Sequence, residues 1–496
     1  MSTVRASTAG CALFPERILR CRLVIRLYYK AFAETRSCLP VRYTSDEVQQ
    51  NTMSPLHDAT TQTQEYAAWI GLDWADQTHF WSMRTTDGPL QRGQLDNTPE
   101  AIEIWAAELA QRFGGRPVAV ALEQARGAVI GTLSKYAHIV LFPVHPNTLA
   151  NYRKSFAPSG AKSDSKDGDL ILDLLVKHPE RLRRLQPDTL ETRRLQFLTE
   201  ERRKQVNQHT SELQRLTNWL KQVFPQILRW FDNPAAPLVG DLLLRWPTLL
   251  QLQKAPPKTL LKFFHQHNCR SEERIQQRLT EIRQAVPATT DEALLETGTL
   301  CIQTCVRTLA QMRASITAFD RQIAEVYRGH PDRAIMESFP GAGPALEPRM
   351  IAAVGSRRER FDSANAIACF VGIAPVKESS GNSCWVHWRW ACPKFIRQTF
   401  HEWAGCSIRT CDWARAYYDR QRAKAKGHHA ALRALAYKWI RIFFRCWRDR
   451  VPYSEVRYHQ ALQARAAQPT PTPTASPVQL QWETCAGFSK LATVSS

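Results

Sequence analysis

Residues 67–144 alternate short apolar runs with polar turns, which is typical of a sheet that carries packed helices. Three apolar runs come first, and each of two further runs follows an amphipathic helical stretch. The pattern predicts strands over 67–73, 78–83, 89–95, 117–123 and 138–144, with helices over 99–113 and 129–136. Three antiparallel strands followed by strands that alternate with helices predict a mixed five-stranded α/β sheet.

Beyond residue 190 the apolar positions take the spacing of long helices. One seam contains Val206, Leu213, Leu216, Leu220 and Val223, and a stronger one contains Ile302, Cys305, Leu309, Met312, Ile316, Phe319, Ile323 and Val326. Steps of three and four are a coiled-coil pattern, which fits an antiparallel hairpin within one chain and equally an association between chains. Five prolines between the seams predict an irregular crossover: Pro234, Pro237, Pro247, Pro256 and Pro257.

The pattern after residue 331 predicts a mainly α-helical domain with turn-rich segments. Residues 339–344, Phe-Pro-Gly-Ala-Gly-Pro, predict a turn whose backbone N–H groups suit a phosphate. A helix over 432–447 has an apolar side, Leu432, Leu435, Trp439, Ile442 and Cys446, and a basic side, Lys438, Arg441, Arg445 and Arg448. The basic side fits either a stripe along a phosphate backbone or a solvated face.

The two ends of the chain differ from the rest. Residues 1–65 contain one short apolar run interrupted by arginine, and we interpret them as a disordered or mis-annotated extension. Translation would start at Met53, with residues 1–52 as an upstream artefact. An organelle-targeting segment is the alternative. Alternating threonine and proline predict a disordered tail over 461–496. Between the ends we expect an α/β domain over 66–185, a coiled-coil region over 190–330 and a mainly α domain over 331–460.

Composition narrows the class of partner. The 66 Lys and Arg residues exceed the 46 Asp and Glu residues, so the formal net charge is +20. This balance favours a polyanion, usually nucleic acid, over a merely basic surface. The 13 cysteines are scattered without a zinc-type CxxC pair, which indicates reduced thiols in a cytoplasmic protein. No apolar run is long enough for a membrane span.

Four acidic residues stand in contexts that suit a divalent-metal site. Asp73 and Glu123 end two predicted buried strands, whereas Asp164 and Asp167 follow Ser163 and share one face of the first turn of a predicted helix. Carboxylates brought together repel unless hard cations lie between them and take their oxygens as ligands. The alternative is that each acid is an ordinary turn or cap residue.

A serine beside glycine is the candidate nucleophile. Ser379, Ser380 and Gly381 lie in a predicted exposed loop, where a hydroxyl group is accessible enough to attack a phosphorus atom. Ser383 follows closely, so Ser379 and Ser383 stay open as alternatives to Ser380. An ordinary polar turn is the simpler interpretation. Trp388 and Trp390 flank Arg389, which suits either stacking on unpaired bases or a strand with one buried face.

In this order, the four acids and the Ser-Gly pair resemble the DEDD transposases of the insertion sequence 110 family, also called bridge-RNA-guided recombinases. The resemblance covers about residues 66–460. It implies an N-terminal domain of the RuvC type, which is ribonuclease H-like, with Asp73, Glu123, Asp164 and Asp167 as metal ligands. It also implies a coiled-coil middle and a C-terminal transposase domain whose nucleophile is Ser380.

The resemblance further implies the reaction and its partners. DNA strands of an element end and a target would be cleaved and exchanged through a phosphoserine link, with Mg²⁺ or Mn²⁺ as cofactor and a noncoding guide RNA. Acids and serine would come from different subunits of a homo-oligomer, a dimer or tetramer, located in the bacterial cytoplasm at the nucleoid. We expect the nucleic acid to contact Lys162, Arg357, Arg358, Arg389, Lys438, Arg441 and Arg445.

Two other functions fit parts of this pattern. A metal-dependent junction nuclease of the RuvC type would need the four acids but not Ser380. An inactive nucleic-acid-binding relic would need only the basic surfaces. The chain departs from many relatives after Gly381, where residues 382–390 read Asn-Ser-Cys-Trp-Val-His-Trp-Arg-Trp in place of further glycines and basic residues.

Overall fold

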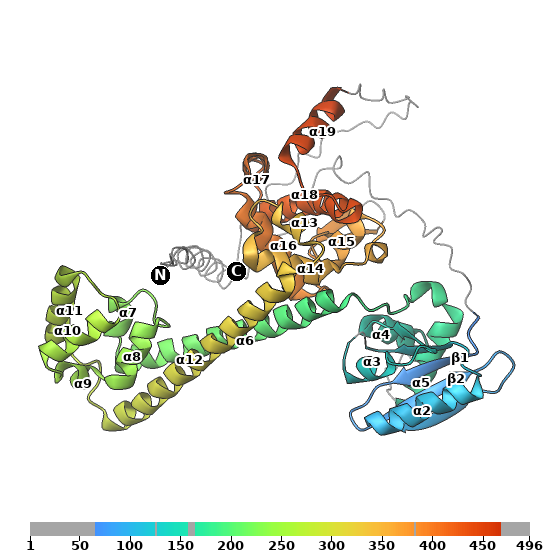
Figure 1. The fold of residues 1–496 in the computed structure, drawn as a ribbon, viewed down its shortest axis with the longest axis horizontal. Helices are drawn as coiled ribbons and strands as arrows, with labels where there is room; N and C mark the ends of the chain where they lie inside the picture. Colours follow the sequence, from blue (N-terminus) through green and yellow to red (C-terminus); the bar gives the residue numbers. More distant parts are fainter. Residues whose placement is uncertain (1–64, 125, 157–163, 381–382, 468–496) are drawn as a thin grey trace, which may run out of the picture. The chain divides into compact units, whose positions relative to one another are not determined.

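The computed structural model describes residues 65–124, 126–156, 164–380 and 383–467 (Figure 1). The predictions for the first 64 residues, for Lys162 and for the tail beyond 467 lie outside this range. The chain divides into two compact units. The first contains the described residues of Met1–Phe197 with Gly355–Arg357 and Pro375–Arg389, and the second contains those of Leu198–Val354, Arg358–Ala374 and Trp390–Ser496.

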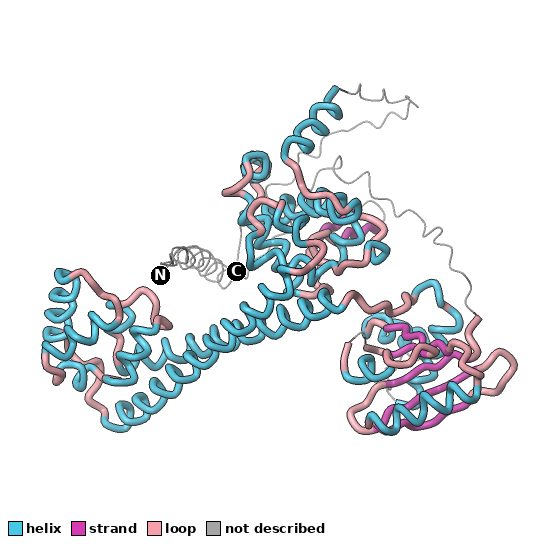
Figure 2. The backbone as a smooth tube through the Cα atoms, viewed as in Figure 1, coloured by secondary structure: helices cyan, strands magenta, loops and turns pink. Residues whose placement is uncertain are grey.

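The first unit contains the predicted mixed sheet, drawn in magenta in Figure 2. Its spatial order is β3-β2-β1-β4-β5; β1, β2 and β3 pair antiparallel, whereas β4 and β5 run parallel to β1. All five strands agree with the prediction to within two residues. The strands are β1 (Ala68–Asp73), β2 (Thr78–Arg84), β3 (Gln91–Asp96), β4 (Val118–Leu122) and β5 (Ile139–Pro143).

Helices cover both faces of this sheet. In β4, the side chains of Val118, Val120 and Leu122 face one layer and those of Ala119 and Ala121 face the other, because successive strand residues point to opposite faces. The helices of the first layer are α2 (Pro99–Arg112) and α3 (Ala128–Leu133), and those of the second are α4 (Pro146–Phe156) and α5 (Asp164–Lys177). The short 3₁₀ helix η2 (Pro179–Arg181) follows.

Glycine lets α5 approach β1 backbone to backbone. A Cβ atom at Gly71 would lie 2.2 Å from the carbonyl oxygen of Gly168 and 2.4 Å from the backbone nitrogen of Leu172. No side chain fits in that space, so glycine at 71 sets how closely the first turns of α5 lie to the end of β1. The predicted acids Asp73 and Asp167 belong to these two segments.

We therefore expect Gly71→Ala to loosen α5 from the sheet, at a cost of about 1–3 kcal/mol for overpacking. Hydrogen exchange of the β1 and α5 amides measures this locally, and protection should fall in both segments. Gly131→Ala is the matched control, since an added Cβ there meets nothing within 4 Å and alanine favours helix. Equal protection in the two variants would contradict this explanation of Gly71.

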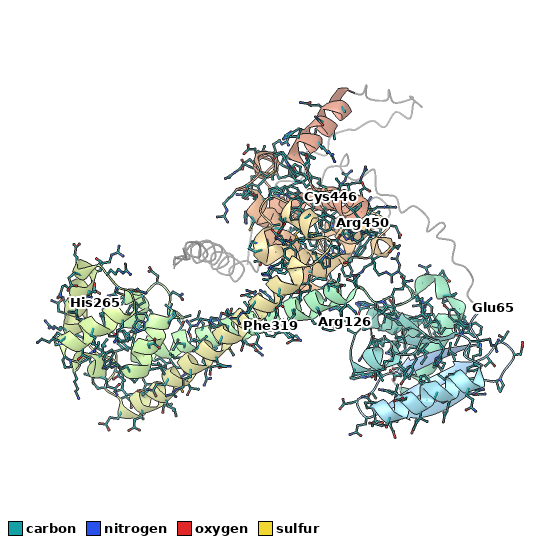
Figure 3. The ribbon with its side chains drawn as sticks, viewed as in Figure 1. Glu65, Arg126, His265, Phe319, Cys446 and Arg450 are labelled. Carbon is teal, nitrogen blue, oxygen red and sulfur yellow. The ribbon has the colours of Figure 1, made fainter. Side chains whose placement is uncertain are left out.

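The second unit is built around the two predicted long helices, which are α6 (Leu190–Val223) and α12 (Glu292–Arg328). They run side by side in Figure 1 and lie antiparallel, since Gly298 contacts Val223 and Arg202 pairs with Asp320. Phe319, labelled in Figure 3, lies on the seam of α12. The predicted hairpin within one chain is confirmed, and the chain-to-chain association stays a prediction.

The predicted irregular crossover between the seams is wrong. The segment forms five short helices, α7 (Gln226–Trp230), α8 (Pro237–Arg245), α9 (Leu249–Gln253), α10 (Pro257–Gln266) and α11 (Glu272–Gln284). Pro237 and Pro257 are the first residues of their helices, where the missing N–H costs no hydrogen bond. The prolines therefore start helices here, and the helices share one core with Leu220 of α6 and Ile302 of α12.

The rest of the second unit is mainly helical, as predicted. Its helices are α13 (Arg333–Glu337), α14 (Gly343–Val354), η3 (Arg358–Arg360), α15 (Ala364–Phe370), α16 (Lys394–Ser407), α17 (Asp412–Ala423), α18 (His428–Asp449) and α19 (Glu455–Ala467). On α18 the predicted apolar residues Leu432, Leu435 and Trp439 are buried. Farther along the helix the prediction is wrong, because Phe443 and Trp447 are fully buried, whereas Ile442 and Cys446 are half-buried. None of the described helices is long and apolar enough to cross a membrane.

Candidate active site

Asp73 and Glu123 lie next to each other at one edge of the sheet. Asp73 is the last residue of β1, and Glu123 directly follows β4, the parallel neighbour in which Leu122 pairs with Leu72. Asp73 lies on the same face of β1 as Trp69 and Gly71, which face α4 and α5. Glu123 continues the face of β4 that carries Ala119 and Ala121. Both carboxylates are half-buried.

Asp167 lies in the first turn of α5, on this side of the sheet. Its side chain is only 2% exposed and accepts two hydrogen bonds from Arg153, at 2.9 Å from Nε and 2.8 Å from Nη2. Arg153 belongs to α4, a helix that the sequence analysis did not predict. The bidentate pair neutralises a carboxylate that would otherwise be buried alone.

The other acids of α5 anchor the helix. Asp169 accepts hydrogen bonds from Ser82 of β2 at 2.6 Å and from Arg92 of β3 at 2.8 and 3.0 Å. Burial raises the pKa of Asp169, but the bonds from Arg92 and Ser82 outweigh it and hold that pKa below its usual value. Asp173 accepts from Tyr152 of α4 at 2.7 Å. These contacts fix α5 against β2, β3 and α4.

The predicted quartet is only partly described. Asp164 begins α5, but its side chain is outside the described part of the chain, as is Lys162. Among the side chains that are described, no three His, Cys, Asp or Glu residues are arranged to hold a metal ion. The fold thus brings Asp73 and Glu123 to one edge and Asp167 to the helix beside it, with Arg153 as the partner of Asp167.

We expect Arg153→Met to destabilise the first unit by about 3–5 kcal/mol, because it leaves the buried Asp167 carboxylate without its counter-ion. Arg92→Met is the matched control: it breaks the pair with Asp169, whose side chains are 55% and 32% exposed, so its cost should be nearer 1 kcal/mol. Urea denaturation of both variants measures the difference. Similar midpoints would mean that the Arg153 pair contributes no more than a surface contact.

Ser380 lies at the end of a strand and not in a loop, which corrects the prediction. It is the last residue of β6 (Val376–Ser380), which pairs antiparallel with β7 (Ser383–His387). Ser380 is exposed and is paired with Ser383, whereas Ser379 is paired with Cys384 and therefore points to the opposite face. The side chain of Ser383 and residues 381–382 lie outside the described part.

The tryptophans after the hairpin do not extend its strand. Strand β7 ends at His387, so the predicted strand with Trp388 and Trp390 on one buried face is wrong. Trp390 is 75% exposed, and Trp385, within β7, is 56% exposed.

The predicted basic contacts differ in environment. Arg358 donates to Asp332 at 3.0 Å, with side-chain exposures of 11% and 6%, so it holds the second unit together and does not present its guanidinium on the surface. Lys438 lies 4.7 Å from the ring centre of Tyr417 and 5.2 Å from that of Trp413, and burial lowers its pKa. These two positions therefore have a packing role that their charge alone did not indicate.

The remaining basic candidates lie nearer the solvent. Arg441 and Arg445 are exposed on α18, where Arg445 lies 3.5 Å from Asp449. Arg357 and Arg389 are half-buried. Arg441 and Arg445 thus remain the most accessible of the predicted phosphate contacts.

Comparisons with known proteins match the two segments of the chain that contain these residues. Residues 70–225, which contain the four acids, match a DEDD model of the IS110 type described as "Transposase". Residues 333–419, which contain Ser380, match the model described as "Transposase IS116/IS110/IS902 family".

Relatives extend the match to most of the chain. The mini-circle protein proposed as a transposase for IS117 of Streptomyces coelicolor is 24% identical over 80% of this chain and 98% of its own length. The 43.6 kDa protein of insertion element IS110 from the same organism is 26% identical over 78% and 95%. The 42 kDa protein of IS900 from Mycobacterium paratuberculosis is 26% identical over 78% and 96%. With both family models matched in order and relatives covered almost end to end, the chain belongs to the IS110 family of insertion-sequence transposases.

Proposed function

We propose that this transposase cleaves and rejoins DNA strands at one composite site of metal-binding acids and a serine nucleophile. The observation that carries the proposal is the position of Asp73 and Glu123 on adjacent parallel strand ends, on the side of the sheet where α5 presents Asp167. The strand order β3-β2-β1-β4-β5 supports a ribonuclease H-like domain of the RuvC type. Rigid strand ends suit acids that must hold a fixed geometry.

The donor set fits a hard divalent cation. Asp73, Glu123, Asp164 and Asp167 offer only carboxylate oxygens, which Mg²⁺ and Mn²⁺ prefer. The buried Asp167 carboxylate already requires a cationic partner, a role that Arg153 fills in this structure. When bound, Mg²⁺ would supply Lewis-acid stabilisation of the charge that develops on the phosphate oxygens. The four acids would hold the cation.

Ser380 would carry the covalent step. Its Oγ attacks the phosphorus, so an O–P bond forms as the bond to the leaving sugar oxygen breaks, and that oxygen takes a proton. The phosphoserine ester conserves the energy of the phosphodiester bond. Attack by a second sugar hydroxyl reverses the step and joins a new strand. No high-energy cofactor is needed. Because Ser380 is exposed at the end of β6, its hydroxyl group is accessible to a phosphate of bound DNA.

DNA is the substrate of a transposase, and the formal charge of +20 suits it. We further propose that a noncoding RNA guides target choice and that the chain acts as a homo-oligomer, a dimer or tetramer, in which acids and serine come from different subunits. Mixing Asp73→Asn and Ser380→Ala subunits tests the composite site. Activity in the mixture, with none in either variant alone, is the expected result.

RNA guidance has a direct test. The full chain is incubated with element-end DNA, target DNA, Mg²⁺ and a transcript of the noncoding DNA that flanks the gene. We expect joined product with this transcript and none with a transcript of scrambled sequence. Equal joining without RNA would reject guidance and leave a transposase that reads DNA itself.

A further inference from the structure

One face of the β6–β7 hairpin carries an exposed tryptophan beside the proposed nucleophile. Glu378 is paired with Trp385 and lies two residues before Ser380 on β6, so the side chains of Glu378, Ser380 and Trp385 share a face. Trp385 is one same-face step along β7 from Ser383, a spacing of about 7 Å at two residues of strand rise. Ser379 and Cys384 lie on the opposite face.

Among the described residues of the first unit, Trp385 belongs to none of the hydrophobic core clusters. Its side chain remains 56% exposed although it lies in regular structure. Leaving an indole in water gives up the free energy of apolar burial. The exposed indole beside the proposed nucleophile is therefore available to contact a bound substrate.

The acid on this face of the hairpin has a histidine partner that reduces its repulsion of a phosphate. The Glu378 carboxylate, on the same face as Ser380, would repel a phosphate, but His387 Nε2 lies 2.6 Å from its Oε1. The hydrogen bond to Glu378, together with the backbone carbonyl of Trp388, raises the pKa of His387 and favours the imidazolium. With a proton on His387, the pair offsets the charge of the acid beside the serine. A flat indole then offers sequence-tolerant stacking, because every base has a π face.

Resting on the proposed function of Ser380, we infer that Trp385 stacks on an unpaired DNA base next to the phosphate that Ser380 attacks. The stacked base fixes that phosphate over the serine, so Trp385 contacts the substrate and positions it. The ligand class is a strand opened at the cleavage point, and intact duplex offers no such π face. Recognition through stacking would leave sequence choice to other contacts.

The test uses element-end DNA with 2-aminopurine placed at each base flanking the cleavage point, because stacking on an aromatic side chain quenches its fluorescence. The protein is the full chain with Ser380→Ala, which removes chemistry and leaves Trp385 in place. We expect quenching at one position, its loss in the double variant with Trp385→Ala, and its retention with Trp385→Phe. Cys384→Ala, exposed on the opposite face, is the matched control and should keep the quenching.

A second readout separates this inference from the proposed function. In the chain with Ser380 intact, Trp385→Ala should slow covalent attachment about 5- to 150-fold, the range of one base–aromatic stack. Quenching that persists in Trp385→Ala at every position overturns the inference, even if attachment occurs. If quenching depends on Trp385 but the chain with Ser380 intact never attaches to DNA, the stacking inference is supported and only the serine mechanism is rejected.

Discussion

Ser380→Ala should abolish covalent attachment of the protein to DNA while leaving DNA binding intact. Removing a nucleophile eliminates the route through the covalent intermediate, and losses on the order of 10⁴-fold or more are expected. Ser380 is exposed at a strand end, so the missing hydroxyl should not affect folding. Denaturing gels of labelled element-end DNA measure attachment, and a mobility shift measures binding.

The register of the hairpin supplies the controls. Ser379→Ala changes the same hydroxyl group on the opposite face and should keep attachment near the level of the unmodified chain. Ser383→Ala tests the residue that is paired with Ser380 across the hairpin. Attachment lost in Ser379→Ala and kept in Ser380→Ala would reverse the assignment of the nucleophile.

Asp73→Asn should reduce strand cleavage about 10³-fold or more, equivalent to about 4 kcal/mol of transition-state stabilisation. Asparagine keeps the size of the side chain but removes the charge that a divalent cation needs. The same variant should weaken Mn²⁺ binding in titration calorimetry, and chelation of the metal should stop cleavage by the unmodified chain. Nucleic-acid binding should persist, since it depends on the basic surfaces.

Asp76→Asn is the matched control for Asp73→Asn. Asp76 lies in the exposed turn three residues later, where its backbone carbonyl, and not its carboxylate, accepts the hydrogen bond from Asn97. Its loss should leave cleavage and Mn²⁺ affinity unchanged. Equal losses in the two variants would point to a general effect of charge near β1, and full activity in Asp73→Asn would remove this acid from the site.

The sheet and its acids could be predicted because short-range pattern determines them. Apolar runs end at Asp73 and Glu123, and burial on both faces requires such runs in β1 and β4. The parallel pairing that makes the two acids neighbours follows from the order of strands and helices. The long helices α6 and α12 were predicted for the same reason, since their seams repeat over many turns.

What could not be predicted depends on contacts between distant segments. Helix α4 buries one residue, Leu149, so few apolar positions mark it in the sequence. Its residue Arg153 has meaning only beside Asp167. The prolines at the first positions of α8 and α10 indicate breaks unless one knows that a helix starts there. Arg358 was assigned to nucleic acid by its charge, whereas its pairing with the remote Asp332 made it structural.

The most direct test of the proposed mechanism is to identify the atom that joins protein to DNA. The full chain, its flanking noncoding RNA, Mg²⁺ and element-end DNA are reacted and denatured, and the DNA is digested to a nucleotide remnant for peptide mass spectrometry. We predict one remnant, a phosphodiester on Ser380. Cleaved DNA with no remnant on any residue would contradict the serine mechanism and favour a metal-dependent nuclease.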